Sequence, residues 1–586
     1  MSMQPQPWPE PAPEIAAAMR RKYAKRKAPL AVTVRDRLGE WLHDEDFAAA
    51  FGVRGRPGWS PARLALITVL QMAENLDDRG AAEAVADRLS WQYALGLGLD
   101  DEGFDHTVLS EFRSRVVAHG LEEHVLDALL ERLASEHLVA AGGKQRTDST
   151  HVISAVRDLN SVELIGESVR ACLEAVAAAA PDWLAAAVCV ADFSRRYGSR
   201  VDTWRLPATK TKRDELAVAY AADGYRLVEA CYGESAPGWL RDLPAVQVLR
   251  VVLVQNYTRA ITGGREVVRR RRAGSEGGDG VPPGHVKIAS PYDTDARWSV
   301  KRDTFWCGYK LHITETCDDA RQGCDCETAS GTQEAAPRSG HRGERPNLIT
   351  NAATTAATVP GNQMTGPIHD VLQARGLTPG RHYLDSGYPS ASLVVSSLHE
   401  FGIVLVTPLL ADTSSQARAG RGYGRSAFTI DYDTEAAICP QGQLSASWSP
   451  AAQRGTTAIV VTFDTATCAP CPVRELCTTS KRNRRQLTIW PREVHQAQAE
   501  GRATQTSKDF QADYTRRAGV EGTMRQTVAV CGSRRARYRG LPKTRLEHIY
   551  SATALNLIRL DAYWNHQPLD RRRTSHLTHL ELALAA

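Results

Sequence analysis

The stretch Tyr514-Thr-Arg-Arg517-Ala-Gly-Val-Glu521 decides which fold to expect for this chain. Its tyrosine, arginine and glutamate are spaced at i, i+3 and i+7, so they share one face if the segment is helical. A carboxylate supplies a hard oxygen ligand for a metal ion, and a guanidinium offers a planar fork to phosphate oxygens. The same spacing is equally typical of a surface helix with an internal ion pair. A metal site therefore needs further acids from elsewhere in the chain.

Two aspartates in strand-like segments are the candidates for those further acids. Asp148 lies in the segment 144–151 and Asp385 in the segment 383–387, and we expect both at strand ends. Two-metal phosphoryl transfer needs carboxylates that converge on ions about 3.5–4 Å apart. Mg²⁺ prefers oxygen ligands and keeps waters, so three carboxylates and a substrate phosphate suffice. Because Asp385 precedes Ser-Gly, a simple turn role for it stays open.

The composition is that of a globular protein with more than one domain. The chain has 586 residues, 42% of them hydrophobic and 24% charged, and a net charge of +5. This length suggests about two to four domains. The net charge does not announce a polyanionic partner, but arginines cluster locally in the way that phosphate contacts require. No signal peptide or membrane span is recognisable, so we expect a cytoplasmic protein without disulfides.

Periodicity predicts a multidomain α/β protein whose parts differ in character. Helical spacing dominates residues 31–140, as in a helix-turn-helix module or a plain helical bundle. Strands and helices alternate over residues 348–407, which favours buried, partly parallel strands there. The predicted parts are a disordered basic arm (1–30), a helical domain (31–140) that would bind DNA if it is the helix-turn-helix module, a first core segment (141–410) with a helical insertion (about 155–285) ending in a linker (263–283), a β-rich insertion (411–505), a core completion with the Tyr514 helix and a C-terminal helix (506–565), and a loose tail (566–586).

The order of the three acid motifs resembles bacterial insertion-sequence transposases of the DDE type. Tyr514, Arg517 and Glu521 match the Tyr-x2-Arg-x3-Glu signature of that family, and the segments around Asp148 and Asp385 look like its first and second acid motifs. The helical region is similar to the N-terminal domain of InsH-type transposases. The resemblance implies an RNase H-like mixed-sheet core in which the three acids are catalytic and hold two Mg²⁺ (or Mn²⁺) ions.

Several cations are candidates for contacts with DNA phosphates. The family signature usually continues with a lysine seven residues after the glutamate, but this chain has Val528 there. Other basic residues must then do that work, and the basic patch at 534–545 also carries a tyrosine that can stack on an unpaired base. A solvated helix face is the alternative for this patch. The candidate residues for DNA or phosphate binding are Tyr514, Arg517, Arg525, Arg534, Arg535, Arg537, Arg539 and Lys310.

Four cysteines in the β-rich insertion form a second constellation. Cys439 precedes a Pro-x-Gly turn. Further along the chain, three more cysteines lie within ten residues of one another: Cys468, Cys471 and Cys477. Four thiolates can hold one tetrahedral Zn²⁺, which would stabilise the insertion and perform no chemistry. The last spacing differs from that of a standard zinc ribbon, so reduced cysteines without metal are the alternative.

The preferred hypothesis is a DNA transposase that cleaves the ends of an insertion sequence and transfers them into target DNA. Double-stranded DNA is then the partner, no membrane is involved, and a homodimer is expected because two DNA ends must be held together. One alternative is a metal-dependent nuclease with the same site but without strand transfer. Another is a DNA-binding regulator that uses the N-terminal helices and has no catalytic activity.

Overall fold

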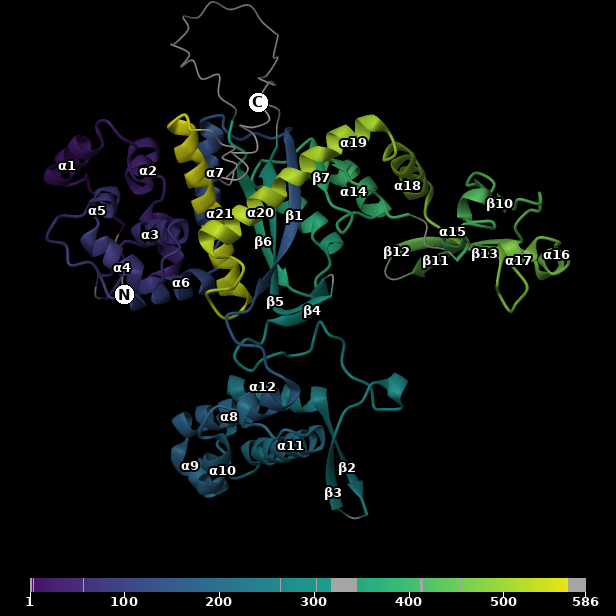
Figure 1. The fold of residues 1–586 in the computed structure, drawn as a ribbon, viewed down its shortest axis with the longest axis horizontal. Coiled ribbons are helices and arrows are strands. Elements are labelled where there is room, and N and C mark those ends of the chain that lie inside the picture. Colours follow the sequence, from purple (N-terminus) through teal and green to yellow (C-terminus); the bar gives the residue numbers. More distant parts are fainter. Residues whose placement is uncertain are drawn as a thin grey trace, which may run out of the picture.

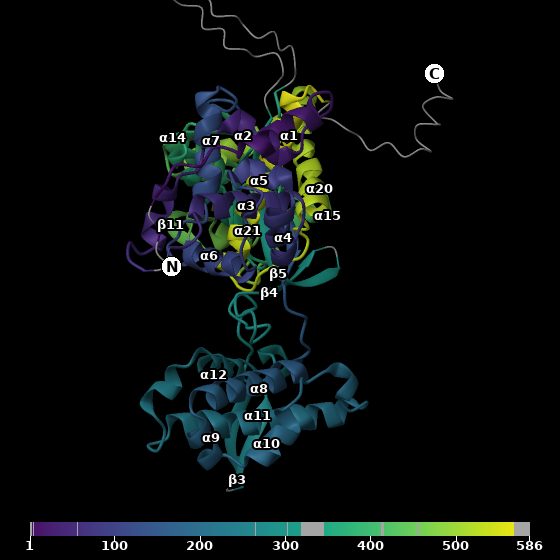
Figure 2. The ribbon, with the colours of Figure 1, turned by 90° about the vertical axis from the view of Figure 1, so that its left-hand side faces the viewer.

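The computed structural model describes residues 3, 5–55, 57–263, 265–301, 303–317, 345–411, 415–453 and 456–567. A mixed sheet lies at the centre, with helices from the N-terminus on one side and a β-rich lobe on the other (Figure 1). A helical insertion lies beyond one end of the sheet, and it stays a separate body when the molecule is turned by 90° (Figure 2). None of the described helices is long and apolar enough to cross a membrane.

The N-terminal region is helical and shares one hydrophobic core with the sheet and the C-terminal helix. Its central helix has a capped N-terminus, because Ser60 accepts a hydrogen bond from the Arg63 N–H and Pro61 occupies the first turn. The helices are α1 (Pro13–Tyr23), α2 (Leu30–Leu38), α3 (Pro61–Ala73), α4 (Asp78–Asp87), α5 (Leu89–Leu95), α6 (Thr107–Ala118) and α7 (His124–Ser135).

The expectation of a disordered arm over residues 1–30 is wrong for α1. This helix buries Ile15 and Met19, one turn apart, against Val32 and its surroundings. The flanking prolines and basic residues dominate the composition of the segment, but two apolar side chains at i and i+4 are enough to seat a short helix on a neighbouring surface.

The central sheet combines antiparallel and parallel pairing. Strand β5 is antiparallel to β1, β4 and β6, whereas β7 is parallel to β1 and β8 is parallel to β7. The order is β4-β5-β1-β7-β8, with β6 paired to β5. The strands are β1 (Lys144–Ile153), β4 (Arg297–Lys301), β5 (Thr304–Thr316), β6 (Ile349–Ala356), β7 (Arg381–Leu384) and β8 (Val404–Val406), and the helices between the last three are α13 (Thr365–Ala374) and α14 (Ala391–Phe401).

The helical insertion between β1 and β4 has a hydrophobic core of its own. Its first helix starts with a capping box in which Asn160 and Glu163 bond each other's backbone N–H groups. Part of the predicted linker 263–283 is instead a strand, because β3 pairs with β2 as an antiparallel hairpin. The elements are α8 (Ser161–Ala179), α9 (Pro181–Ala187), α10 (Val190–Tyr197), α11 (Lys210–Tyr232), α12 (Pro244–Asn256), β2 (Tyr257–Thr262) and β3 (Arg265–Arg270).

The β-rich lobe also has a small core, built around two phenylalanines, Phe428 and Phe463. Strands β11, β12 and β13 form an antiparallel sheet, and β9 pairs with β10. The elements are α15 (Ser415–Ala419), β9 (Thr429–Asp431), β10 (Ala436–Ile438), β11 (Ser447–Gln453), β12 (Thr456–Thr462), α16 (Thr465–Cys468), α17 (Arg474–Cys477), β13 (Gln486–Ile489) and α18 (Arg492–Thr504).

The segment with the tyrosine, arginine and glutamate is not one continuous helix. Helix α19 (Lys508–Tyr514) ends at the tyrosine, a 3-10 helix (Thr515–Ala518) carries the arginine, and α20 (Gly519–Cys531) carries the glutamate. Helix α20 packs on β1 and β5. Helix α21 (Leu541–Trp564) packs on β6 and on the N-terminal helices α3, α6 and α7. Most of the predicted tail, from residue 568 onward, lies outside the described residues.

Candidate functional site

The strand register brings the two aspartates together. Thr147 of β1 pairs in parallel with Leu384 of β7, so the next residues, Asp148 and Asp385, follow at the same level of the sheet. Asp385 comes directly after β7, and its carboxylate accepts a hydrogen bond from the Gly387 N–H at 2.8 Å. Asp148 lies in the middle of β1, so the expectation of a strand end is wrong for this residue.

Arg517 connects the first and third acids directly. Its guanidinium donates to Asp148 Oδ2 at 2.6 Å and to Glu521 Oε1 at 2.9 Å. Asp148 is nearly covered, with 12% of its side chain exposed, whereas 50% of the Glu521 side chain is exposed. Arg517 and Glu521 are i and i+4 in sequence, and the helical turns at 515–521 bring their side chains together. Residues 369 positions apart in sequence thus form one cluster.

The electrostatics of this cluster favour binding of a cation. Burial raises the pKa of Asp148, and the neighbouring Asp385 acts in the same direction. The Arg517 guanidinium and the Ser149 N–H oppose this rise but do not cancel it. When two carboxylates lie close together and are partly buried, a cation bound between them stabilises their ionised forms.

Helix α19 is fixed against β7 by a residue that the sequence interpretation missed. Asp513 accepts hydrogen bonds from Tyr383 at 2.9 Å and Arg381 at 2.6 Å. The neighbouring Tyr514 donates its hydroxyl to the Leu384 carbonyl at 3.1 Å and stacks on Phe510. An acid directly before the tyrosine was visible in the sequence, but its partners on β7 were not. Tyr514 is thereby held at the residue before Asp385.

A buried ion pair holds the turn that carries Arg517. Arg146 of β1 pairs with Glu315 of β5 at 2.7 Å and donates to the Arg516 carbonyl at 2.7 Å. Glu315 is fully buried and also pairs with Arg559 of α21 at 2.8 Å. Sequence patterns do not show this network, because its members come from four distant segments.

Tyr388 is buried close to Asp148 and Asp385. It follows Asp385 by three residues, and its hydroxyl lies 2.6 Å from Nδ1 of His312. Burial holds the pKa of its phenol well above the usual value, and that of His312 is lowered by burial to about 3. Both side chains therefore stay neutral at ordinary pH. His312 contacts this tyrosine and Thr355 rather than an acid.

Besides Arg517, three of the predicted phosphate-binding cations are occupied by contacts within the chain. Arg534 donates to the Thr150 hydroxyl and to the His151 carbonyl, and Arg537 donates to Leu76 of the N-terminal region. Lys310 donates to the Val359 carbonyl at 2.7 Å. These contacts indicate structural roles. In contrast, the remaining cations of the prediction are exposed; they are Arg525, Arg535 and Arg539.

Two further aspartates, just before β4, form hydrogen bonds that hold neighbouring segments together. Asp293 accepts hydrogen bonds from Ser154 and Tyr309, and Asp295 accepts one from the Leu541 N–H at the start of α21.

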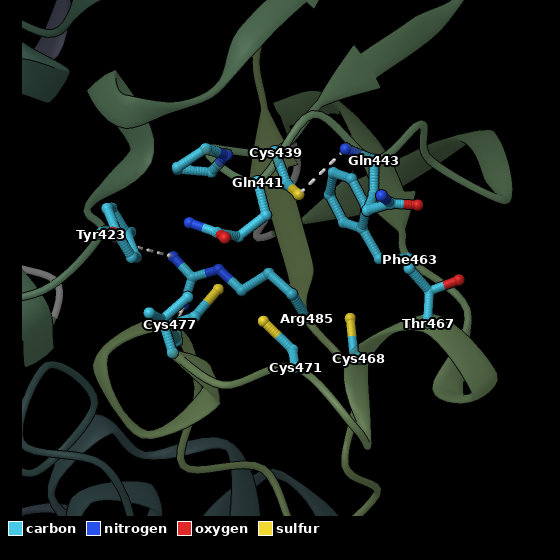
Figure 3. Close-up of a pocket in the computed structure, with 12 residues that line it drawn as sticks. Tyr423, Cys439, Gln441, Gln443, Phe463, Thr467, Cys468, Cys471, Cys477 and Arg485 are labelled. Carbon is cyan, nitrogen blue, oxygen red and sulfur yellow. Dashed lines mark hydrogen bonds between the residues drawn. The ribbon is translucent and has the colours of Figure 1, made fainter.

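The four cysteines of the β-rich lobe line one cavity, and Cys439 lies across it from the other three (Figure 3). The Cys439 sulfur accepts a hydrogen bond from the Gln443 N–H at 3.4 Å, which closes the Pro-x-Gly turn. Burial raises the pKa of Cys477, and the Arg485 guanidinium beside it opposes that rise. All four sulfurs are free thiols of intermediate exposure.

Neither constellation is already arranged as a metal site. Within the described ranges, no group of three His, Cys, Asp or Glu side chains stands ready to hold a metal ion. At the acid cluster the reason is visible, because the Arg517 guanidinium lies between Asp148 and Glu521. The donor set itself, three carboxylates, is of the kind that Mg²⁺ and Mn²⁺ prefer. A metal ion at this place would require the arginine side chain to move aside.

The fold and the site define an α/β protein with a carboxylate cluster at the centre of a mixed sheet, joined to an N-terminal helical region. Comparison with protein families specifies the class. Residues 438–561 match the family model described as a transposase DDE domain, and residues 23–115 match a transposase domain, DUF772. The two matches indicate that the chain is an insertion-sequence DDE transposase.

The matched ranges include only one of the three acids of the cluster. The DDE range contains Tyr514, Arg517 and Glu521 as well as the four cysteines, but it begins after Asp148 and Asp385. At the coarse level, the match supports an enzyme that acts on DNA and a family that uses divalent metal ions. No curated protein and no solved structure matches the chain.

Proposed function

We propose that this transposase cleaves the phosphodiester bonds at the ends of an insertion sequence and joins the freed 3′-hydroxyl groups to target DNA. The observation that carries the proposal is the contact of Arg517 with Asp148 and Glu521, beside Asp385 at the adjacent strand end. Three acids from β1, the end of β7 and α20 converge there. The strand order, with antiparallel strands followed by two parallel ones, supports an RNase H-like core.

Asp148, Asp385 and Glu521 are the residues that would hold two Mg²⁺ (or Mn²⁺) ions. When bound, such ions activate the attacking hydroxyl group and stabilise the leaving oxygen. The burial of Asp148 favours this role, because a covered carboxylate with a raised pKa gains most from a nearby cation.

Arg517 and its exposed neighbours are proposed to bind the DNA phosphates. Once displaced from the acids, the Arg517 guanidinium remains beside the cleavage point and offers two parallel N–H donors to a phosphate. Arg525 lies one helical turn beyond Glu521 and is exposed, so it is suited to the position of the missing lysine. Tyr514 holds the end of β7 and lines the same place.

The test is cleavage and joining of a labelled duplex that carries the element end, with Mg²⁺ present. Alanine at any of the three acids should abolish both products, whereas binding of the end should persist. Cleavage by Glu521→Ala at the rate of the unchanged protein would contradict the proposal. A nuclease would cut without joined products, and a DNA-binding regulator would bind equally well without Mg²⁺ and yield no products. Terminal inverted repeats in the flanking DNA would favour the transposase over both.

A homodimer is proposed for the active complex, because both element ends must be processed together. Analytical ultracentrifugation of the protein with two end duplexes should show two chains per pair of ends. One chain per pair would contradict this part of the proposal.

We also propose that Cys439, Cys468, Cys471 and Cys477 bind one structural Zn²⁺. The four thiols line a single cavity, and the N–H···S bond to Cys439 is of the kind that stabilises a thiolate. Their intermediate exposure allows the side chains to turn toward a common point. Zinc would stabilise the lobe, whose own core is small.

Metal analysis of the purified chain tests the zinc site. We expect about one zinc per chain, lost in the double variant Cys471→Ser/Cys477→Ser. The control is Cys189→Ser, which alters an exposed cysteine of the helical insertion. Zinc-free protein after growth with added zinc would contradict the site.

A further inference from the structure

The hairpin of the helical insertion concentrates positive charge on a projecting ribbon. Between residues 259 and 272 the chain has six arginines and a single acid, Glu266. Strands β2 and β3 form the hairpin, which extends from the insertion on the side away from the central sheet (Figure 1). The same part stays at the far end of the molecule in the turned view (Figure 2).

The strand register divides the hairpin into two faces with different roles. In antiparallel strands, paired residues share a face and successive residues alternate. One face carries the pairs Tyr257–Arg270 and Arg259–Val268, and it packs on the insertion. Its arginines are engaged there: Arg259 pairs with Glu229 and lies over the Tyr225 ring, and Arg270 lies 3.8 Å from Asp214.

The opposite face is open and carries unpaired charge. It contains the pairs Thr258–Arg269 and Ala260–Val267, so the arginine lies beside a threonine, an alanine and a valine. Arg269 and Arg272, which lies two residues beyond the strand, are exposed, and their side chains form no hydrogen bond or ion pair within the described ranges. One acid is near, because the Thr258 hydroxyl lies 3.5 Å from Asp279. Arginines kept free of partners on a projecting surface suit an anionic ligand.

We propose that this hairpin binds the phosphate backbone of double-stranded DNA outside the acid cluster, with Arg269 and Arg272 as its phosphate contacts. The major groove admits a two-stranded ribbon, and small residues on the outer face let the ribbon approach closely. The inference rests on the proposed function. It adds a contact surface that lies in neither range matched by the transposase families.

The experiment is a fluorescence anisotropy titration of a labelled duplex of about 40 base pairs, carried out over a series of salt concentrations. Loss of two phosphate contacts in Arg269→Ala/Arg272→Ala should weaken binding about three- to tenfold near physiological salt and reduce the salt slope by about two. The variant Arg269→Lys/Arg272→Lys keeps the charge and should bind nearly as the unchanged protein does.

The matched control removes equal charge elsewhere on the same insertion. Arg195 and Arg200 are exposed near the end of α10, and their double alanine variant should bind DNA normally. Unchanged affinity and slope in the Arg269/Arg272 alanine variant, or an equal loss in the control, would overturn the inference. Cleavage at saturating duplex should be retained, because the hairpin is not part of the acid cluster. Failure of the unchanged protein to bind or cleave any element end would instead overturn the proposed function.

Discussion

At the residue scale, Arg517 is the side chain on which the site depends. It forms ion pairs with two acids at once, and its Nε is buried without a partner among the described residues. Burial of a guanidinium nitrogen is unfavourable when no acceptor is present. If Arg517 is displaced from the acids, as proposed above, a DNA phosphate can supply that acceptor.

Replacement of Arg517 by glutamine should lower cleavage about 100-fold, since a positively charged group at the reacting phosphate is lost. The measurement is the single-turnover rate on a labelled end duplex. Arg516→Gln is the control, because Arg516 belongs to the same 3-10 turn but contacts Asp513 instead of the acids. Equal rates for Arg517→Gln and the unchanged protein would show that the arginine does not serve catalysis.

Gly519 illustrates how one position constrains the whole turn. A Cβ atom there would lie 2.0 Å from Nη1 of Arg146, which cannot simply move because it is bonded to Glu315 and to the Arg516 carbonyl. Gly522, three residues on in the same helix, has open space around it.

The paired substitutions Gly519→Ala and Gly522→Ala should therefore have opposite effects. The first should destabilise the chain by about 1–3 kcal/mol through overpacking and reduce cleavage, because the Arg517 turn must shift. The second should stabilise the exposed side of α20 by about 0.5–1 kcal/mol and leave cleavage unchanged. Urea unfolding and the cleavage assay measure both; a harmless Gly519→Ala would show that the turn is not held as described.

At the scale of elements, the buried Glu315 network couples the sheet to the C-terminal helices. Glu315 of β5 pairs with Arg146 of β1 and with Arg559 of α21, and it accepts a hydrogen bond from Thr523 of α20. Both positive partners hold the pKa of this carboxyl below its usual value in spite of complete burial. The cluster joins the elements that carry the first and third acids.

Removal of the shared acid in Glu315→Ala should cost about 3–5 kcal/mol, because two arginines would remain in a covered place without their partner. Urea unfolding followed by tryptophan fluorescence measures the loss. The control is Glu111→Ala, which removes an exposed partner of Arg115 and should change stability little. A loss as small as that of the control would contradict a coupling role for the network.

At the scale of the whole molecule, stability should fall as the solution becomes acidic. Burial lowers the pKa of His369 to about 4 and that of His548 to about 3, and His312 behaves alike. Above pH about 6.5 these side chains are neutral in both states, so their contribution to stability is fully present. As the pH falls below that value, only the unfolded chain takes up protons, and stability is lost at about 1.4 kcal/mol per pH unit for each group.

Thermal unfolding between pH 7.5 and 4.5 checks this expectation. The melting temperature of His369→Leu should depend less steeply on pH than that of the unchanged chain. The exposed His399, replaced by leucine, provides the control and should leave the slope as it is. Identical slopes for all three proteins would mean that buried histidines do not govern the acid limit.

Local sequence determined the elements and the chemical character of the site. The strand-like segments and the spacing of Tyr514, Arg517 and Glu521 predicted an α/β chain with a metal-binding acid motif. These features could be recognised because they depend on neighbours within a few residues. Helix α1 was not predicted, because the residues against which Ile15 packs lie in other helices and not within a few residues of it.

Only the tertiary structure decided how the site is assembled. The register of Thr147 with Leu384 sets the two aspartates side by side, and the packing of α20 on β1 brings Arg517 between Asp148 and Glu521. It also distinguishes Arg525, which is exposed, from Arg537, which is held by the N-terminal region. Such pairings join residues hundreds of positions apart, and their geometry follows from packing of whole elements rather than from any local pattern.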